Sequence, residues 1–305
     1  MKLDELDDRN KKAVDAKQIG KDLDTKDIHG LSPYVGLVEC SNRPKTSSWL
    51  MLLANTDDMV AAKYFYSGQY EQTSITLWCA LVQHSNMVLD IGSHTGVYSL
   101  AASATNSSVK IVSIEPVAQN VYRQRLNIRA NGFTNITVIQ AAASKQTGVV
   151  QLNVPDLGSY LTQGASLTSK TKSSKLTQVQ GISIDKSIQF HDTLDLVKID
   201  AEGGEIEAML GMKQTIEKHL PIILFECNDP KICKPVEKIL FDLNYRIFVI
   251  DESQEQLDET DALTVLRERD GSLARNLMNR IAVHKDKITE FIQTLNQVDL
   301  KVRSN

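Results

Sequence analysis

The chain has 305 residues, of which 42% are hydrophobic and 24% charged, and its formal net charge is −4. This composition is typical of a globular protein and allows one large or two small domains. The slight acidity argues against a general nucleic-acid binder, because such proteins more often carry a basic surface. Apolar runs such as 221–225 are far shorter than the roughly 20 residues that span a bilayer.

The first residues, MKLDELDDRN, contain no apolar stretch after their charges, so we expect no secretory signal. Residues 1–28 are dense in Asp and Lys and show little helical periodicity. They predict a solvated arm or a short exposed helix, and a partner-binding segment is the alternative.

Four cysteines are scattered along the chain: Cys40, Cys79, Cys227 and Cys233. Cys227 and Cys233 have no close Cys or His partners at the spacing of a zinc site. We therefore expect reduced structural thiols, and a cytoplasmic location follows as the default.

From about Trp78 onward, short β-rich runs alternate with amphipathic stretches. Strands are expected at 87–91, 109–114 and 136–140, with helices at 97–104 and 117–130 and a turn at 92–96. Asn131 and Gly132 supply a stop for the second helix. Such alternation indicates a parallel sheet covered by helices on both faces.

The pattern then breaks. Residues 148–154 and 178–184 predict a hairpin, and 156–175, rich in Ser, Thr, Gly and Lys, predicts a loop or lid. Lys170, Lys172 and Lys175 of this segment suit a solvated basic loop, or alternatively an anionic substrate.

The alternation resumes after the hairpin. Strands are expected at 194–199, 221–226, 245–250 and 277–284, with one helix through 206–220 and another at 235–243 that has Pro235 in its first turn. About seven main strands in one α/β domain result.

The turn after the first strand, Gly92-Ser93-His94-Thr95-Gly96, is suited to lie under a ligand, because glycine allows close approach and positive φ. His94 occupies the middle glycine of the dinucleotide fingerprint. Glu115 follows Gly92 by 23 residues, where an acid can accept hydrogen bonds from ribose hydroxyls. The alternative is an ordinary strand–turn–helix with incidental acids.

Further residues extend this candidate cofactor site. Asp90 is placed to anchor a cationic amino group, and small residues after the third strand leave space for an adenine ring. The predicted cofactor-binding set is Glu71, Asp90, Gly92, Ser93, His94, Gly96, Glu115, Pro116, Asn120, Ala141 and Ala142.

The stretch DLVKIDAEGGE, from Asp195 to Glu205, leads from a buried strand into acids and glycines at a helix start. In a doubly wound sheet the fourth strand lies beside the first, so Asp200 and Glu202 should face the crevice that contains Gly92. Helix capping explains Glu205 and is the alternative for one of the other acids. Lys198, Asp200 and Glu202 are the candidate catalytic residues.

Several stretches together resemble the FkbM-type methyltransferase family: GQYE at 68–71, VLDIGSHTGVYS at 88–99, IEP at 114–116, Asn127, VKIDAEGGE at 197–205 and PIILFE at 221–226. Their order and spacing hold over roughly residues 50–284. Ser93-His94 stands where members usually have Ala-Asn.

The resemblance implies a Rossmann-like class I fold with strand order 3-2-1-4-5-7-6, S-adenosylmethionine as methyl donor, and O-methylation. It implies small-molecule, sugar, glycolipid or macrolide-type acceptors. It also suggests that Tyr70 and Glu71 line the cofactor site. We expect an N-terminal extension over residues 1–50 and the methyltransferase domain over 51–305, with a lid-like insertion at about 148–184.

For methyl transfer to a hydroxyl, we hypothesise that Asp200 or Glu202 acts as base or orients the substrate, with Lys198 tuning charge. His94 is an alternative base, although cofactor contact suits it better. A Mg²⁺ site formed by Asp200 with Glu226, Asn228 and Asp229 is a less favoured alternative to polar loop residues. Two other function classes stay open: a nicotinamide-dependent oxidoreductase and a non-catalytic nucleotide-binding or scaffold protein.

Overall fold

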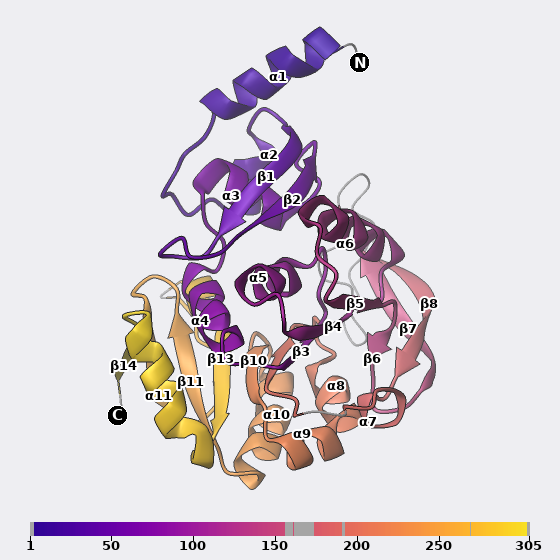
Figure 1. Cartoon of the computed structure of the whole chain (residues 1–305), viewed down its shortest axis with the longest axis vertical. Coiled ribbons are helices and arrows are strands. Elements are labelled where there is room, and N and C mark those ends of the chain that lie inside the picture. Colours follow the sequence, from indigo (N-terminus) through magenta and orange to yellow (C-terminus); the bar gives the residue numbers. More distant parts are fainter. Residues whose placement is uncertain (1–2, 156–160, 162–173, 191–192, 269, 304–305) are drawn as a thin grey trace.

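A large, mostly parallel sheet forms the centre of the computed structural model, which describes residues 3–155, 161, 174–190, 193–268 and 270–303 (Figure 1). Within these residues the sheet has nine strands in the order β14-β12-β11-β13-β10-β9-β3-β4-β5. The strands are β3 (Met87–Ile91), β4 (Lys110–Ile114), β5 (Ile136–Ile139), β9 (Leu196–Ile199), β10 (Ile222–Glu226), β11 (Tyr245–Asp251), β12 (Gln256–Thr260), β13 (Asn279–His284) and β14 (Lys301–Arg303).

Seven of these strands have the class I methyltransferase arrangement. From β5 to β11 the order is third, second, first, fourth, fifth, seventh and sixth, and β13 runs antiparallel to both neighbours. The predicted strand order is therefore confirmed. The sheet is two strands wider than predicted, because β12 and β14 are short, largely polar segments without an apolar run.

Helices cover both faces of this sheet, as predicted. Neighbouring strand residues contribute to opposite apolar layers: Val88 belongs to one and Leu89 to the other. The first layer includes α3 (Met59–Ser67), α4 (Gln72–Val82), α5 (Val97–Thr105) and α11 (Ile288–Gln297), and the second includes α8 (Glu205–Gly211), α9 (Lys213–His219) and α10 (Pro230–Asp242). Figure 1 shows α5 and α10 on opposite sides of the strands.

Two predicted helices have different boundaries. The helix expected through 206–220 is interrupted between α8 and α9, where Gly211 lies against the backbone of Ser144. A Cβ on Gly211 would be 2.1 Å from the Ser144 carbonyl oxygen. The helix expected from 235 begins at Pro230 instead, because Asp229 caps it by accepting a hydrogen bond from the Lys231 N–H at 2.8 Å. Pro235 is therefore inside α10 rather than in its first turn.

The expectation of reduced thiols was wrong for one cysteine pair. Cys227 and Cys233 form a disulfide with a Cα–Cα distance of 5.6 Å. The Asp229 cap starts α10 immediately after β10, and this first turn returns Cys233 to the strand end, which spacing alone did not reveal. Cys40 and Cys79 are free and buried. The thiol argument for a cytoplasmic location therefore loses its basis.

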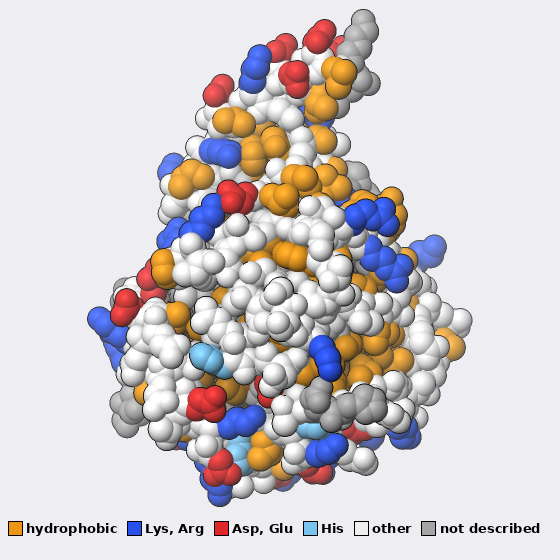
Figure 2. All heavy atoms as spheres, viewed as in Figure 1, with side chains coloured by type: hydrophobic (Ala, Val, Ile, Leu, Met, Phe, Trp, Pro, Cys, Tyr) orange, Lys and Arg blue, Asp and Glu red, His pale blue; other side chains and the backbone are white. Residues whose placement is uncertain are grey.

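The N-terminal segment begins with the exposed helix α1 (Leu3–Asp15), which extends from the body of the molecule (Figure 1). Figure 2 shows acidic and basic side chains mixed along it, in agreement with a solvated helix. The following α2 (Thr25–His29) is anchored, because Ile28 is fully buried.

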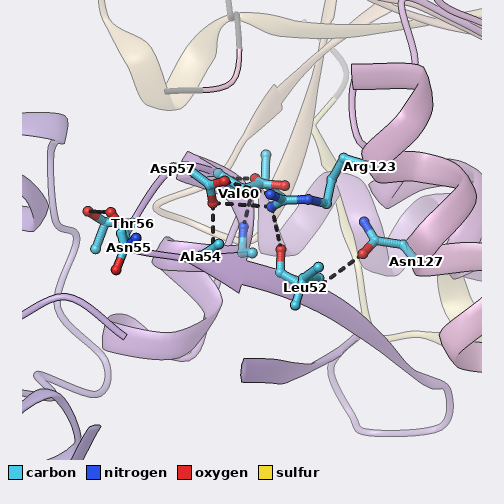
Figure 3. A network of polar contacts seen from close by, with 10 residues as sticks. Leu52, Ala54, Asn55, Thr56, Asp57, Val60, Arg123 and Asn127 are labelled. Carbon is cyan, nitrogen blue, oxygen red and sulfur yellow. Dashed lines mark hydrogen bonds and ion pairs between the residues drawn. The ribbon is translucent and has the colours of Figure 1, made fainter. Parts of the chain in front are cut away.

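The antiparallel hairpin of β1 (Val35–Ser41) and β2 (Ser48–Ala54) packs against α6 (Ala118–Asn131). Arg123 of α6 donates hydrogen bonds to the Leu52 carbonyl at 2.8 Å and to both carboxylate oxygens of Asp57, at 3.1 and 2.5 Å (Figure 3). Asn127 accepts a hydrogen bond from the Leu52 N–H at 2.8 Å. These contacts fix β2 against α6.

The predicted hairpin is confirmed as β7 (Gly148–Pro155) paired with β8 (Ser174–Ile182). β8 also pairs with the two-residue β6 (Ala142–Ala143), and α7 (Ile184–Ser187) follows. Most of the predicted lid, including Lys170 and Lys172, lies outside the described residues. No helix in the described ranges has both the length and the apolarity to cross a membrane.

Candidate functional site

A cavity of about 710 Å³ opens at the carboxyl ends of the central strands. Its lining includes Ile91 of β3, Ile114 of β4, Asp200 after β9 and Glu226 of β10. This is where open α/β sheets bind ligands, and the volume is typical of a small-molecule site.

The cavity brings together the two sequence segments that we expected to converge. Its lining contains all three candidate catalytic residues and all candidate cofactor residues except Gly96. These are Lys198, Asp200, Glu202, Glu71, Asp90, Gly92, Ser93, His94, Glu115, Pro116, Asn120, Ala141 and Ala142. Gly96 lies behind the wall at the start of α5, with φ of 97°, and its missing side chain leaves room for Gln124.

The glycine turn contacts the β9 segment directly through its backbone. Gly92 has φ of 73°, and a Cβ there would be only 1.7 Å from the Asp200 carbonyl oxygen. The Asp200 N–H donates to the Ile91 carbonyl at 2.9 Å. The absence of a side chain at Gly92 is therefore a condition for joining the two segments.

His94 adopts a left-handed conformation, with φ of 51°. Its backbone N–H donates to Glu115 Oε2 at 3.0 Å, which directs the turn toward the end of β4. Its Nε2 atom is buried and has no hydrogen-bond partner among the described residues. The imidazole therefore keeps one polar atom for a ligand.

Glu115 is held firmly in the wall. Besides the His94 N–H, it accepts hydrogen bonds from the Val117 N–H at 2.9 Å and from Asn120 Nδ2 at 3.2 Å. Burial raises the pKa of Glu115, against the opposing effect of His94 and these hydrogen bonds. Each carboxylate oxygen has two lone pairs, so this anchored group still has capacity to accept hydroxyl donors.

Asp90 is a buried carboxyl below the turn. Ser99 Oγ donates to its Oδ2 at 2.6 Å. Burial raises the pKa of Asp90 to about 6, although the Ser99 hydrogen bond and the Lys198 charge lower it.

Lys198 is the buried cation of the site. Its side chain is 1% exposed, and Nζ lies 3.2 Å from Asp200 Oδ2 and 5.1 Å from the centre of the Tyr98 ring. Burial lowers the pKa of Lys198, but the carboxylates of Asp200, Glu71 and Glu226 raise it by more. Lys198 therefore remains an ammonium group and is not a proton acceptor.

Glu205 has the capping role that the sequence predicted. Its carboxylate accepts hydrogen bonds from the Ala201 N–H at 3.0 Å and from the Gly203 N–H at 3.0 and 3.2 Å. It thus stabilises the loop that displays Glu202, which has φ of 48° and lines the cavity.

In the described part of the chain, no three Asp, Glu, His or Cys side chains are arranged to hold a metal ion. Two of the suggested Mg²⁺ ligands have other partners. Asn228 donates to Glu226 Oε2 at 2.8 Å, and Asp229 caps α10.

Sequence reasoning missed Glu252, which follows β11 and lines the cavity. It accepts hydrogen bonds at the start of α4, from the Thr73 N–H at 2.7 Å and the Ser74 N–H at 3.1 Å. Burial raises the pKa of Glu252 to about 7, and the nearby charge of Glu71 adds to this. The sequence signal that could have identified Glu252 was its place as an acid just after the predicted strand at 245–250.

Glu71 links the start of α4 to α5. It precedes α4 in a left-handed conformation and accepts a hydrogen bond from the Tyr98 hydroxyl at 2.6 Å. The GQYE stretch thus brings Glu71 to the cavity.

Among solved structures, an FkbM methyltransferase from Methylobacillus flagellatus is 16% identical to this chain. The match covers 75% of this chain and 55% of that one, at a TM-score of 0.44. This chain thus spans just over half the length of that protein. A SAM-dependent O-methyltransferase from Thermotoga maritima is 11% identical over 88% of this chain and 85% of that one, at a TM-score of 0.40. A precorrin-6y C5,15-methyltransferase from Geobacter metallireducens is 14% identical over 70% of this chain and 88% of that one, at a TM-score of 0.41. At this level of likeness their reactions do not carry over to this chain.

No curated protein matches the sequence. The family model of the methyltransferase FkbM domain, however, matches residues 90–247, more than half of the chain. These residues run from β3 and the glycine turn through β9 and β10 into β11, and so include about half of the described cavity lining. The chain belongs to the FkbM methyltransferase family.

Proposed function

We propose that this protein is an S-adenosylmethionine-dependent methyltransferase that methylates a hydroxyl group of a small molecule, such as a sugar or another natural product. The observation that carries the proposal is the backbone contact between Gly92 and Asp200. This contact joins the glycine turn and the acid-bearing end of β9 in one cavity.

The cavity wall fits this cofactor. The His94 Nε2, which has no partner among the described residues, and the anchored Glu115 carboxylate are both suited to a nucleoside. In this proposal Glu115 holds the ribose hydroxyls, with Ser93, Pro116 and Asn120 beside it, and Ala141 and Ala142 leave space for the adenine. Asp90 and Glu71 face the amino group. When bound, the cofactor supplies a methyl group on a positively charged sulfur.

The acceptor hydroxyl needs a group that removes its proton as it reacts. We assign this role to Asp200 or Glu202, which line the cavity beside the glycine turn. Lys198 holds the Asp200 carboxylate in place at 3.2 Å and limits the negative charge around it. His94 is the alternative base, since its Nε2 is unpartnered in the described structure.

Thermal unfolding with S-adenosylhomocysteine or NADH tests the cofactor. A ligand at 100 times its Kd stabilises the folded state by about 2.7 kcal/mol, so S-adenosylhomocysteine should raise Tm and NADH should not. A preference for NADH would indicate an oxidoreductase instead. Absence of any effect from either ligand would indicate a scaffold protein.

Substitution of the acids tests the base. Asp200→Asn and Glu202→Gln keep size and hydrogen-bonding capacity but cannot take up a proton. The variant that lacks the base should lose roughly 10²–10⁴-fold in kcat, with S-adenosylhomocysteine affinity retained. Near wild-type turnover in both variants would rule out these two acids as the base.

A further inference from the structure

The side of the cavity away from the glycine turn is formed by acids from two further strands. Beyond β9 the sheet continues with β10, β13 and β11, and β10 and β11 run in the same direction as β3. Glu226 ends β10 and Glu252 follows β11, so both lie at the same edge as Gly92. If the nucleoside occupies the turns after β3 and β4, as proposed above, these two acids border the space left for the acceptor.

Acidic groups far outnumber basic groups around this cavity. Among the described residues, its lining contains ten Asp or Glu residues and three Lys or Arg residues. Of the basic residues, Lys198 is paired with Asp200 and Lys63 with Asp22, at 3.2 and 3.9 Å, and Arg275 lies near the charge of Asp24. The three described basic residues of the lining thus already lie near carboxylates.

The charges of neighbouring carboxylates act on both Glu226 and Glu252. Burial raises the pKa of Glu226 well above its usual range, and the charges of Asp200, Glu202 and Glu71 add to this effect, while Lys198 opposes it. Glu71 also raises the pKa of Glu252. These acids therefore repel one another, and a cationic ligand would relieve the repulsion.

A neutral group in the same wall supplies an independent indication. Gln72, at the start of α4, lines the cavity and is only 9% exposed. Its Nε2 donates to Thr76 Oγ1 at 3.4 Å, but its Oε1 has no partner among the described residues. A buried oxygen without a donor loses free energy that a ligand donor would recover.

We propose that the acceptor is a hydroxylated compound that carries a protonated amine, such as an amino sugar, and that Glu226, Glu252 and Gln72 bind this amine. An ammonium group has three donors and no acceptor, which matches a wall made of acceptor oxygens. A phosphorylated or carboxylated acceptor would be repelled by the same wall. This inference rests on the proposed methyltransferase function.

The test uses the full chain saturated with S-adenosylhomocysteine and three probes of similar size: glucosamine, glucose and glucose 6-phosphate. Thermal unfolding gives the binding of each probe. Glucosamine should raise Tm clearly more than glucose, and glucose 6-phosphate should give no increase. Glu226→Gln and Glu252→Gln should each weaken glucosamine binding about tenfold or more, since hydrogen bonds to charged groups are the stronger ones.

Glu268→Gln is the matched control, because it removes the same charge from an exposed residue outside the cavity. It should bind glucosamine like the wild type. The S-adenosylhomocysteine effect on each variant shows that its site is folded. If the wild type binds S-adenosylhomocysteine but glucosamine is no better than glucose, the amine inference is wrong while the methyltransferase proposal stands. If S-adenosylhomocysteine itself fails to bind, the proposed function fails. Glucosamine binding that survives unchanged in both Gln variants would overturn the assignment of these acids.

Discussion

Gly92→Ala tests the contact between the glycine turn and the end of β9. The left-handed backbone at Gly92, with φ of 73°, costs a residue with a side chain about 1–2 kcal/mol. The new Cβ would lie 1.7 Å from the Asp200 carbonyl oxygen, so one of the two segments must move. Overpacking of this kind costs about 1–3 kcal/mol. We expect a loss of roughly 2–5 kcal/mol in the free energy of unfolding, and a decrease in Tm of roughly 3–8 °C.

Substitutions at two other glycines separate the backbone cost from the steric cost of Gly92→Ala. Gly132 has φ of 67°, but a methyl group added there would have no atom within 4 Å, so Gly132→Ala should show the backbone cost alone, about 1–2 kcal/mol. Gly211 does not have a left-handed φ, but its Cβ would lie 2.1 Å from the Ser144 carbonyl oxygen, so Gly211→Ala should show the steric cost alone. Circular dichroism followed during thermal and urea unfolding measures all three variants.

Ligand binding gives a second measurement on the same variants. Gly92→Ala should also weaken S-adenosylhomocysteine binding at least tenfold, because the displaced turn lines the cavity, whereas Gly132→Ala should not change it. If Gly92→Ala is no less stable than Gly132→Ala, the two segments are not in the close contact described, and the central argument for a shared site fails.

Three further predictions concern stability. Arg123→Met should lower the free energy of unfolding, measured by urea denaturation, by about 3–5 kcal/mol, because it leaves the Asp57 carboxylate, 12% exposed, without its ion-pair partner. Adding Asp57→Leu should recover part of this loss. The pKa of Glu252 rises from 4.5 to about 7 on folding, so the stability that it contributes is complete below pH 4.5 and decreases by about 3 kcal/mol as the pH rises to 7. Glu252→Gln should flatten that slope in unfolding curves at several pH values. Reduction of Cys227–Cys233, which closes a short loop, should cost about 2 kcal/mol and lower Tm by a few degrees in dithiothreitol, with no such effect in the Cys227→Ala/Cys233→Ala variant.

The sequence predicted the central sheet well because its strands are buried on both faces. Val88 and Leu89 pack into opposite apolar layers, so the strand is a short continuous apolar run between turn residues. Strand β12 lacks this signal, because its sequence QLDET is mostly polar and its pairing with β11 and β14 defines it. Local pattern also missed the interruption at Gly211, which depends on the distant Ser144 backbone.

The candidate site, like the fold, could be predicted only in part from the sequence. The rule that ligands bind at the carboxyl ends of parallel strands was sufficient to place Gly92 and Asp200 in one cavity. It was not sufficient for Glu252, whose position depends on hydrogen bonds to Thr73 and Ser74, 178 or more residues earlier in the chain. No local sequence signal contains the information that α4 begins at that point of the wall.

The same contact explains how so many acids coexist in one cavity. The start of α4 offers Glu252 two backbone N–H donors and a favourable dipole, so this carboxyl is held by the helix rather than by a basic side chain. Lys198 is then the single buried cation among the described lining residues, and it is already paired with Asp200. An arrangement of this kind costs stability in the free protein, and a positively charged ligand would recover that cost. Cationic ligands should therefore stabilise the fold by more than neutral ligands that make the same number of hydrogen bonds.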